Sequence, residues 1–397
     1  MGLREPTGGP LGHHRQVVVA QTLPSFERWG SLVGKRVLVR VDFNTPVAEV
    51  DGRLEVTDDF RIRATVPLFE ELLARGATVV ACTHFGRPKG QVVAKYSVDP
   101  VRRRLSELCP GVTLMENLRF NPGEEANDPV FGASLVEGFD YYINEAFGAS
   151  HRAHASIMIP PTLRPSAAGS NLAREVATLT SLLETPDRPF VAIIGGAKVA
   201  DKLAITKVLC DKADTVIVGG GMAYTFEASQ GRTIGSSLYD GSYLEQCAQL
   251  LAQGNVSIPS DALGLASGAP FGDGGAEPAL AFGSNIPEGF VGLDIGPVSI
   301  EAFKEVIANA ATILWNGPMG VFEDPRFAGG TEAVARAVAA SPAISVVGGG
   351  DSVAALAQFG LEDQVSFVST GGGASLELVE LGDLPGLKAL RESPFNA

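Results

Sequence analysis

The feature that most constrains this chain is the alternation of short apolar runs with helical stretches along its whole length. Apolar, β-prone runs occupy residues 36–41, 77–83, 113–118, 141–144, 190–194, 215–218, 312–315, 344–347 and 365–369. Between them, residues 65–75, 200–212 and 331–340 have apolar side chains at helical spacing. Strands that alternate with helices form parallel sheets covered by helices on both faces. We therefore expect an α/β protein.

The length of the chain indicates more than one sheet. At 397 residues it exceeds what one hydrophobic core usually supports, and with 45% apolar residues it can bury two. Residues 171–184 have helical spacing, and they are followed by Thr-Pro-Asp-Arg-Pro at 185–189 and then by a new strand. We predict two doubly wound, Rossmann-like parallel-sheet lobes, joined by this helix, with a cleft between them. Residues 266–281, rich in Gly, Ala and Pro, should form a surface loop or an edge segment.

Composition excludes several classes of protein. The net charge of −14 leaves no basic surplus for nucleic acid, and the apolar runs are too short to span a membrane. No signal peptide is recognisable in residues 1–23, which should form a loose extension. The four cysteines are too far apart for a CxxC motif and fit buried apolar positions in a reducing compartment. We expect a soluble, cytoplasmic protein with neither a nucleic-acid nor a membrane partner.

Polar residues and glycines follow nearly every predicted strand, where ligands of open parallel sheets bind. In the first half of the chain, the segments after predicted strands contain Arg87, Arg119, Arg152, His84 and His151. Arg61 stands near the start of a predicted helix. Arginine binds carboxylate and phosphate through paired hydrogen bonds, so the set suits a small ligand that carries both groups. Any one arginine could instead be a solvated surface residue, and His154 could be a hydrogen-bonded core residue.

The second half supplies glycine-rich turns at 195–196, 219–221, 348–350 and 371–373. Such turns bring backbone N–H groups close to phosphate oxygens. Lys198 and Lys202 should share one helix face, Asp351 could hold Mg²⁺, and Glu323 could bind ribose hydroxyls. The alternatives are tight strand–helix packing for the glycines and a helix cap near Ser352 for Asp351. Walker, dinucleotide, protein-kinase and nucleophile-elbow motifs do not occur.

Longer segments resemble the phosphoglycerate kinase family. They are RVDFN at 40–44, GRPKG at 86–90, ENLRF at 116–120, HRAHAS at 151–156, GGAKVADK at 195–202, GGGMAYTF at 219–226, WNGPMGVFE at 315–323, GGGDS at 348–352 and STGGGASLE at 369–377. The resemblance runs from about residue 34 to 390. It implies a monomer that closes about a hinge and transfers phosphate reversibly between ATP and the carboxylate of 3-phosphoglycerate. The products are 1,3-bisphosphoglycerate and ADP, in glycolysis and gluconeogenesis.

The resemblance also implies roles for residues at matching positions. Phosphoglycerate would be bound by Asp42, Phe43, Asn44, Arg61, His84, Phe85, Gly86, Arg87, Arg119 and Arg152. Mg-nucleotide would be bound by Lys198, Lys202, Gly292, Asn316, Glu323, Gly349, Gly350, Asp351, Ser352 and Val353, with Asp351 on the metal. Arg61 and Lys198 would stabilise the transferring group, helped by helix N-termini at the Gly349 and Gly372 turns. The acceptor carboxylate is already ionised, so we expect no general base.

On this basis we expect an extension at 1–23, a phosphoglycerate lobe at 24–171, a helix and hinge at 172–188, and a nucleotide lobe at 189–384. Residues 385–397 should pack back onto the first lobe. Three departures from the family pattern, Thr45, Phe85 and Glu145, remove no charged ligand. Two alternatives stay open, another acyl-phosphate-forming kinase of small acids and a nucleotide-binding protein that has lost its activity.

Overall fold

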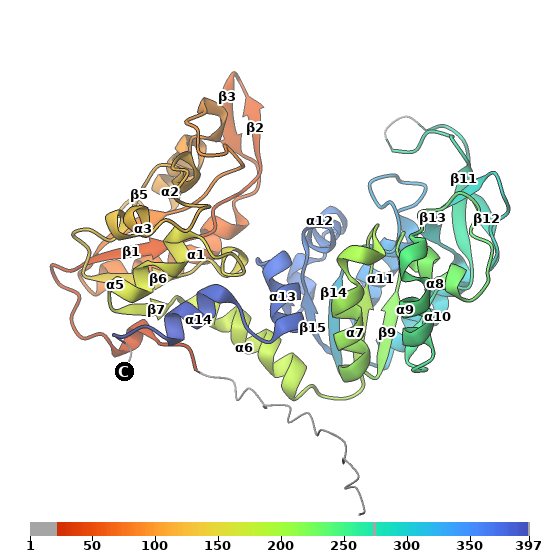
Figure 1. Ribbon diagram of the computed structural model, residues 1–397. Coiled ribbons are helices and arrows are strands. Elements are labelled where there is room, and N and C mark those ends of the chain that lie inside the picture. Colours follow the sequence, from red (N-terminus) through yellow and green to blue (C-terminus); the bar gives the residue numbers. More distant parts are fainter. Residues whose placement is uncertain (1–21, 273–274, 396–397) are drawn as a thin grey trace, which may run out of the picture.

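The computed structural model describes residues 22–272 and 275–395, so the expected N-terminal extension lies almost wholly outside the described residues. Two parallel sheets, each with its own helices, lie at opposite ends of the molecule, and α6 (Ser170–Glu184) runs between them (Figure 1). The α/β architecture expected from the alternation of apolar runs is confirmed. Within the part of the chain that is described, no helix is long and apolar enough to cross a membrane.

The first lobe is built on a five-stranded parallel sheet in the order β5-β4-β1-β6-β7. Its strands are β1 (Arg36–Arg40), β4 (Thr78–Cys82), β5 (Thr113–Leu114), β6 (Tyr141–Asn144) and β7 (Ser166–Ala168), and a hairpin of β2 (Val47–Val50) and β3 (Arg53–Val56) projects from it. Its helices are α1 (Phe60–Ala74), α2 (Asp99–Leu108), α3 (Pro129–Leu135), α4 (Ala155–Met158) and α5 (Pro160–Leu163), with 3₁₀ turns η1 (Phe26–Arg28), η2 (Ala94–Tyr96), η3 (Leu118–Phe120) and η4 (Phe147–Ala149).

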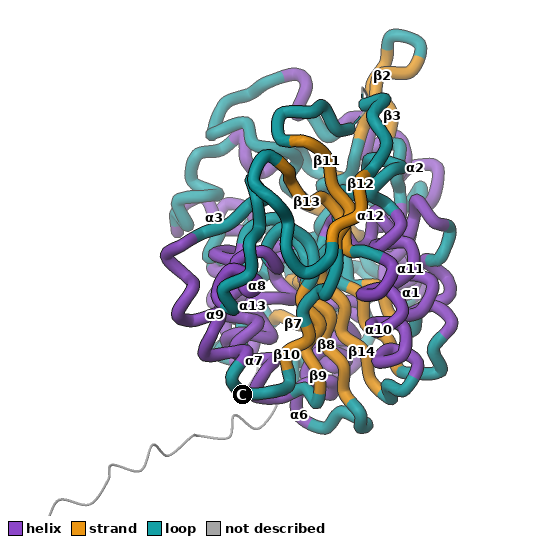
Figure 2. Tube along the Cα trace, turned by 90° about the vertical axis from the view of Figure 1, so that its right-hand side faces the viewer, coloured by secondary structure: helices purple, strands orange, loops and turns teal. Residues whose placement is uncertain are grey.

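The second lobe is built on a six-stranded parallel sheet in the order β10-β9-β8-β14-β15-β16. Its strands are β8 (Phe190–Ile194), β9 (Thr215–Val218), β10 (Val256–Ser257), β14 (Thr312–Asn316), β15 (Ile344–Val347) and β16 (Phe367–Val368). Its helices are α7 (Leu203–Lys212), α8 (Ala223–Ser229), α9 (Leu244–Leu251), α10 (Pro297–Ala308), α11 (Gly329–Ala340), α12 (Gly350–Phe359) and α13 (Gly373–Leu381), with 3₁₀ turns η5 (Val199–Asp201), η6 (Gly241–Tyr243) and η7 (Glu362–Gln364). Figure 2 shows its central strands between α7, α9 and α13 on one side and α10 and α11 on the other.

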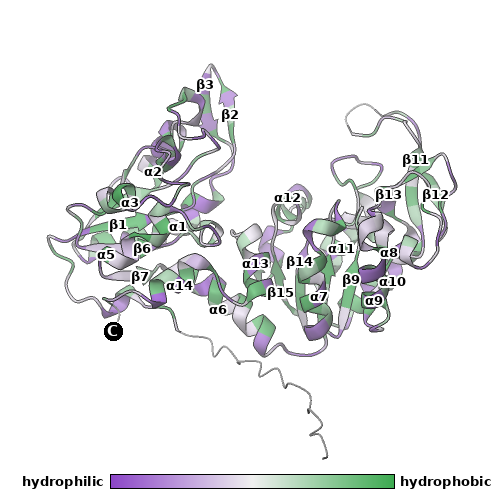
Figure 3. Cartoon of the chain, viewed as in Figure 1, coloured by the Kyte–Doolittle hydropathy of each residue, from purple (hydrophilic) through white to green (hydrophobic). Residues whose placement is uncertain are grey.

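The strands are apolar throughout because both faces of each sheet are covered. Along β8, Phe190, Ala192 and Ile194 enter the core under α7, α9 and α13, whereas Val191 and Ile193 enter the core under α10, α11 and α12. Successive side chains of a strand point to opposite faces, so a strand covered on both faces is apolar without interruption. In Figure 3 the strands of the two parallel sheets are largely hydrophobic, whereas the β2–β3 hairpin is more hydrophilic.

The chain crosses between the lobes twice. The first crossing is α6, and the second follows α13 and leads into α14 (Pro385–Arg391), which packs on α4, α5 and β7 of the first lobe. The Gly386 N–H donates to the Ser150 carbonyl at 2.8 Å. Leu172 and Leu179 of α6 share one continuous core with α7, α13 and α14. The region between the two sheets is therefore packed, not a loose linker.

Two elements differ from expectation. The surface loop or edge segment expected at 266–281 links, in its described residues, β11 (Ala262–Ala266) to the edge strand β12 (Leu280–Phe282). With β13 (Phe290–Ile295) these strands form an antiparallel sheet, in the order β12-β11-β13, that was not anticipated. The expectation that Lys198 and Lys202 share a helix face was wrong. Lys198 precedes the 3₁₀ turn η5 and Lys202 follows it, before α7 begins at Leu203, so the two side chains diverge.

Candidate active site

A cavity of about 220 Å³ opens where β1, β4 and β6 end. We call it the arginine cavity. Its lining consists of Asp42, Asn44, Arg61, His84, Arg119, Gly148, Ala149, His151, Arg152, His154 and Thr370, Gly371, Gly372 and Gly373, the last four from the second lobe. Six of the side chains expected to bind phosphoglycerate therefore lie around one space: those of Asp42, Asn44, Arg61, His84, Arg119 and Arg152.

Arg61 stands in the first turn of α1 and connects the two lobes. Its Nη1 lies 3.0 Å from Asp42 Oδ2, and its Nη2 donates to the Thr370 carbonyl at 3.1 Å. Burial alone would raise the pKa of Asp42, but nearby positive charge, Arg61 first, brings that pKa below its ordinary value. The carboxylate thus stays ionised and holds Arg61 at the edge of the cavity.

The other arginines differ in exposure. Arg119 is buried, donates from Nη1 to the Gly86 carbonyl at 2.7 Å and pairs with Glu125 at 3.1 Å; burial lowers the pKa of its guanidinium. Arg152 is half-buried and donates from Nε to His151 Nε2 at 3.1 Å. Arg87 is exposed and does not line the arginine cavity, so the structure does not bring it together with the others.

The three histidines of the cavity share one electrostatic character. Burial lowers the pKa of His84 well below its ordinary value, and it lowers the pKa of His154 to about 4. The pKa of His151 is also lowered by burial, with Arg152 adding to the shift. All three imidazoles are therefore neutral near pH 7, and the positive charge of the cavity comes from its arginines.

Phe43, Phe85 and Gly86 contribute through the backbone. The rings of Phe43 and Phe85 are buried in the core beneath the cavity. The Phe43 N–H donates to Thr83 Oγ1 at 3.0 Å, and the Gly86 N–H donates to Asn44 Oδ1 at 2.8 Å. These contacts place Asn44 at the cavity. Because both phenylalanine rings are buried, they have no access to a ligand there.

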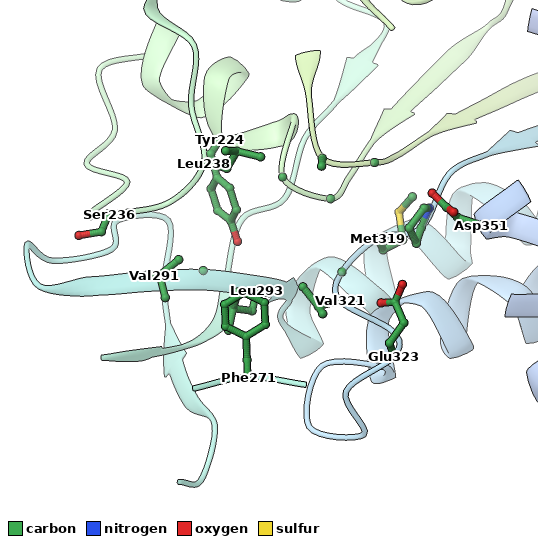
Figure 4. Close-up of a pocket in the computed structure, with 17 residues that line it drawn as sticks. Tyr224, Ser236, Leu238, Phe271, Val291, Leu293, Met319, Val321, Glu323 and Asp351 are labelled. Carbon is green, nitrogen blue, oxygen red and sulfur yellow. The ribbon is translucent and has the colours of Figure 1, made fainter. Parts of the chain in front are cut away.

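A second cavity, of about 520 Å³, lies where the strands of the second lobe end. We call it the glycine cavity. Its backbone lining includes glycines 196, 220, 221, 292 and 320, and its side-chain lining is Tyr224, Ser236, Leu238, Phe271, Val291, Leu293, Met319, Val321, Glu323 and Asp351. Figure 4 shows Tyr224, Phe271 and Leu293 toward one end and Asp351 with Glu323 toward the other. An apolar end beside a glycine-lined, acidic end suits a ligand with an aromatic base and a metal-bound phosphate chain.

Lys202 and Asn316 contact each other where β8 and β14 end, and neither is among the residues that line the glycine cavity. Lys202 Nζ donates to Asn316 Oδ1 and to the Gly195 carbonyl, each at 2.6 Å. Burial lowers the pKa of Lys202 to about 8, opposed by the charge of Asp351. Lys198, by contrast, is exposed and lines a small neighbouring cavity with Tyr239 and Asp240. The structure therefore does not bring Lys198 and Lys202 together.

Gly349 and the first turn of α12 contain the remaining predicted nucleotide residues. Gly349 has φ +95°, and a Cβ there would lie 2.7 Å from Asn316 Nδ2, so glycine is required for this close approach. The Ser352 hydroxyl is buried and accepts a hydrogen bond from the Gly317 N–H at 2.5 Å. Gly349, Gly350 and Val353 line a third cavity, of about 300 Å³, together with Asn44, Arg61 and Gly372. This space joins the two lobes.

Asp351 does not occupy the cap position of α12. It lies inside the first turn of α12, whose cap position is Gly349, and no side chain caps that helix. Its carboxylate is exposed and lines the glycine cavity. In residues 22–272 and 275–395 no cluster of three or more His, Cys, Asp or Glu side chains could hold a metal. A single carboxylate beside a glycine-rich turn fits Mg²⁺, which takes most of its ligands from phosphate and water.

Sequence reasoning missed several residues that shape the site. Thr370 accepts the Arg61 hydrogen bond, and the buried carboxylate of Glu175 on α6 accepts hydrogen bonds from Ser369 and Thr370. Tyr224 and Phe271 form the apolar end of the glycine cavity. Thr370 and Tyr224 lie within segments that follow strands, which is the signal that could have found them. Phe271 lies in a loop with no such signal.

Comparison with known proteins gives a consistent result. The phosphoglycerate kinase family model matches residues 30–113 and 110–381. A phosphoglycerate kinase of Rubrobacter xylanophilus is 49% identical over 386 residues, covering 91% of this chain and 96% of the relative. A phosphoglycerate kinase of Moorella thermoacetica is 46% identical over 390 residues, covering 91% of this chain and 97% of the relative.

Solved structures agree with these relatives. The structure of phosphoglycerate kinase from Coxiella burnetii has a TM-score of 0.83 at 35% sequence identity, covering 93% of this chain and 99% of that chain. The structure of phosphoglycerate kinase from Pyrococcus horikoshii has a TM-score of 0.79 at 28% sequence identity, covering 94% of this chain and 99% of that chain. With two parallel-sheet lobes, an arginine cavity and a glycine cavity at their strand ends, and relatives that match over nine-tenths of its length, the chain belongs to the phosphoglycerate kinase family.

Proposed function

We infer that this chain, a phosphotransferase of the phosphoglycerate kinase family, passes a phosphoryl group reversibly between ATP and the carboxylate of 3-phosphoglycerate. The observation that carries the assignment is the pairing of an arginine cavity on one lobe with a glycine cavity on the other. The first suits a small ligand with carboxylate and phosphate groups, and the second suits a nucleotide. The reaction belongs to glycolysis and gluconeogenesis.

We assign phosphoglycerate to the arginine cavity, with Arg61, Arg119 and Arg152 as its main anion-binding groups. Asp42, Asn44 and His84 complete the polar lining. Mg-nucleotide goes to the glycine cavity, with its base toward Tyr224 and Phe271 and its phosphates toward the Gly349 turn. Asp351 would hold Mg²⁺ when it is bound, and the ion would neutralise phosphate charge.

Transfer to a carboxylate requires positioning and charge neutralisation, because the acceptor needs no deprotonation. Arg61 reaches from the arginine cavity to Thr370 and lines the third cavity, so we assign it to the transferring group. The N-termini of α12 and α13, at Gly349 and Gly372, border the same space and direct backbone N–H groups toward negative charge. Lys198 is the second cation, and it must move from its exposed position to take part.

Domain closure would supply the movement that this role requires of Lys198. We propose that residues 24–171, with 385–397, form the phosphoglycerate lobe, that residues 189–384 form the nucleotide lobe, and that the lobes approach each other about residues 172–188. Closure would exclude water and bring Lys198 and Arg61 to the same phosphoryl group. Each cavity is complete within one chain, which supports a monomer. The four cysteines are free and buried, which suits a reducing cytoplasm.

A coupled assay tests the assignment. Purified protein, Mg²⁺ and ATP should phosphorylate 3-phosphoglycerate in preference to a panel of small carboxylic acids that lack its phosphate. Preference for another acid would favour the alternative acyl-phosphate kinase. No turnover with any acid, together with retained nucleotide binding in calorimetry, would favour an inactive nucleotide-binding protein.

A further inference from the structure

A group of buried charged side chains lies beneath the arginine cavity and has no part in the steps above. Arg40, the last residue of β1, and Glu124 are both completely buried, and Arg40 Nη2 lies 3.9 Å from Glu124 Oε1. Arg40 Nε donates to Ser156 Oγ at 2.9 Å, and that hydroxyl donates to Glu124 Oε1 at 2.7 Å. The Ser156 N–H donates to Glu124 Oε2 at 3.0 Å. This network fixes the plane of the Arg40 guanidinium.

The same guanidinium faces His84. Arg40 Nη2 lies 3.2 Å from His84 Nδ1, and a guanidinium can only donate hydrogen bonds. His84 Nδ1 must therefore accept, so in the neutral ring the proton is on Nε2. Asp42 Oδ1, at 4.0 Å from Nδ1, is too distant to hold a proton there through a hydrogen bond.

The surrounding charges keep this ring neutral. Burial is the main cause that lowers the pKa of His84, and Arg40, Arg119 and Arg152 lower it further, against the opposing effect of Asp42. Among the described residues, His84 Nε2 has no hydrogen-bond partner, and the ring lines the arginine cavity. Carboxylate and phosphate oxygens are acceptors. An Nε2–H group suits them, whereas the other tautomer would present a lone pair to a negative ligand.

We propose that Arg40, held by Glu124 and Ser156, is a positioning residue that fixes His84 as the Nε2–H tautomer, so that the imidazole donates a hydrogen bond to an anionic oxygen of phosphoglycerate. The binding part of this proposal rests on the assignment of the arginine cavity to phosphoglycerate. Arg40 does not line the cavity, so it acts through His84. Its role is distinct from that of Arg61, Arg119 and Arg152, which face the ligand themselves.

Nuclear magnetic resonance of the ligand-free, ¹⁵N-labelled protein tests the tautomer independently of any substrate. The His84 signals, assigned by their loss in His84→Gln, should show a proton on Nε2 and none on Nδ1 from about pH 6 to 8. The double variant Arg40→Met, Glu124→Gln removes both buried charges together, and Arg40→Lys is a milder second variant that keeps the charge. In a folded variant of either kind, His84 should exchange between tautomers or take up a second proton. A proton on Nδ1 in the parent, or an unchanged Nε2–H ring in both variants, would overturn the proposal.

Steady-state kinetics test the consequence for binding. The double variant should raise KM for 3-phosphoglycerate about tenfold, the scale of one hydrogen bond to a charged group, and leave KM for ATP unchanged. His84→Gln, whose amide nitrogen can occupy the Nε2 position, should retain more affinity than His84→Asn, whose nitrogen lies near Nδ1. Equal losses in these two variants would contradict donation from Nε2. If Arg152→Ala leaves calorimetric binding of phosphoglycerate unchanged, the assignment of the cavity fails while the tautomer result stands.

Discussion

Replacement of Arg61 by alanine is the sharpest test of the mechanism. The change removes two contacts, the ion pair to Asp42 at 3.0 Å and the hydrogen bond to the Thr370 carbonyl at 3.1 Å. It also removes the one arginine, among the described residues, that lines both the arginine cavity and the third cavity between the lobes. If Arg61 stabilises the transferring group, turnover should fall by about 100-fold or more, which corresponds to ~2.7 kcal/mol of transition-state stabilisation.

The effect on folding should be smaller than the effect on turnover. The hydrogen bond to Thr370 is worth about 1 kcal/mol, and the ion pair, with a third of the Arg61 side chain exposed, is worth at most about 1 kcal/mol. The free energy of unfolding should therefore fall by about 1–2 kcal/mol. A domain stabilised by roughly 5–15 kcal/mol remains folded after such a loss.

The assay measures turnover at saturating ATP and 3-phosphoglycerate, with urea denaturation of the same preparations. Arg63→Ala is the matched control, because Arg63 lies on the same helix, pairs with Asp59 at 2.8 Å and is 62% exposed. The control should keep turnover within a few-fold of the parent. Turnover of Arg61→Ala within a few-fold of the parent, or an equal loss in Arg63→Ala, would refute the assigned role.

Three further predictions concern the lobes, the metal and Glu145, a buried carboxylate that accepts hydrogen bonds from the Asn171 and Leu172 N–H groups of α6. Lys198→Ala should impair nucleotide contacts and transfer while sparing phosphoglycerate binding, and Arg152→Ala should do the reverse; calorimetry in which both variants lose the same ligand would contradict this division. Asp351→Asn should raise the half-saturating Mg²⁺ concentration and lower turnover by roughly tenfold or more, whereas an unchanged Mg²⁺ titration with normal turnover would remove Asp351 from the metal. Burial raises the pKa of Glu145 to about 7 from 4.5, so the native state keeps a proton that the unfolded state loses between these values. The free energy of unfolding should then fall as pH rises from about 5 to 8, by at most ~3 kcal/mol, and Glu145→Gln should flatten this slope in urea denaturation; equal slopes would contradict the shift.

The central strands could be predicted because both of their faces are buried. The strands at Tyr141–Asn144 and Phe190–Ile194 begin and end where the apolar runs do. The antiparallel sheet β12-β11-β13 escaped prediction because β11 is Ala-Leu-Gly-Leu-Ala and β12 is mostly exposed, so neither has a clear pattern. The prediction that Lys198 and Lys202 share a helix face was wrong because a 3₁₀ turn separates the two residues before α7 begins.

Some residues of the candidate site could also be predicted from the sequence, and others could not. The arginines that follow strands could be predicted to lie close together, because the carboxyl ends of parallel strands meet at one edge of a sheet. The environment of a buried charged residue could not be predicted, because it depends on partners distant in sequence. Arg40 is buried against Ser156, 116 residues away, and Glu175 holds a loop nearly 200 residues away. Such contacts exist only once the lobes have formed.

The return of the chain to its first lobe has a consequence for biosynthesis. Helix α14 completes the packing of α4, α5 and β7, and its Leu387 and Leu390 are buried. A ribosome releases α14 only after the whole second lobe has been made. The first lobe can therefore begin to fold early, as N-terminal units generally do. It stays without α14 until the second lobe has been synthesised, so a chain terminated within the second lobe would lack part of both lobes' shared core.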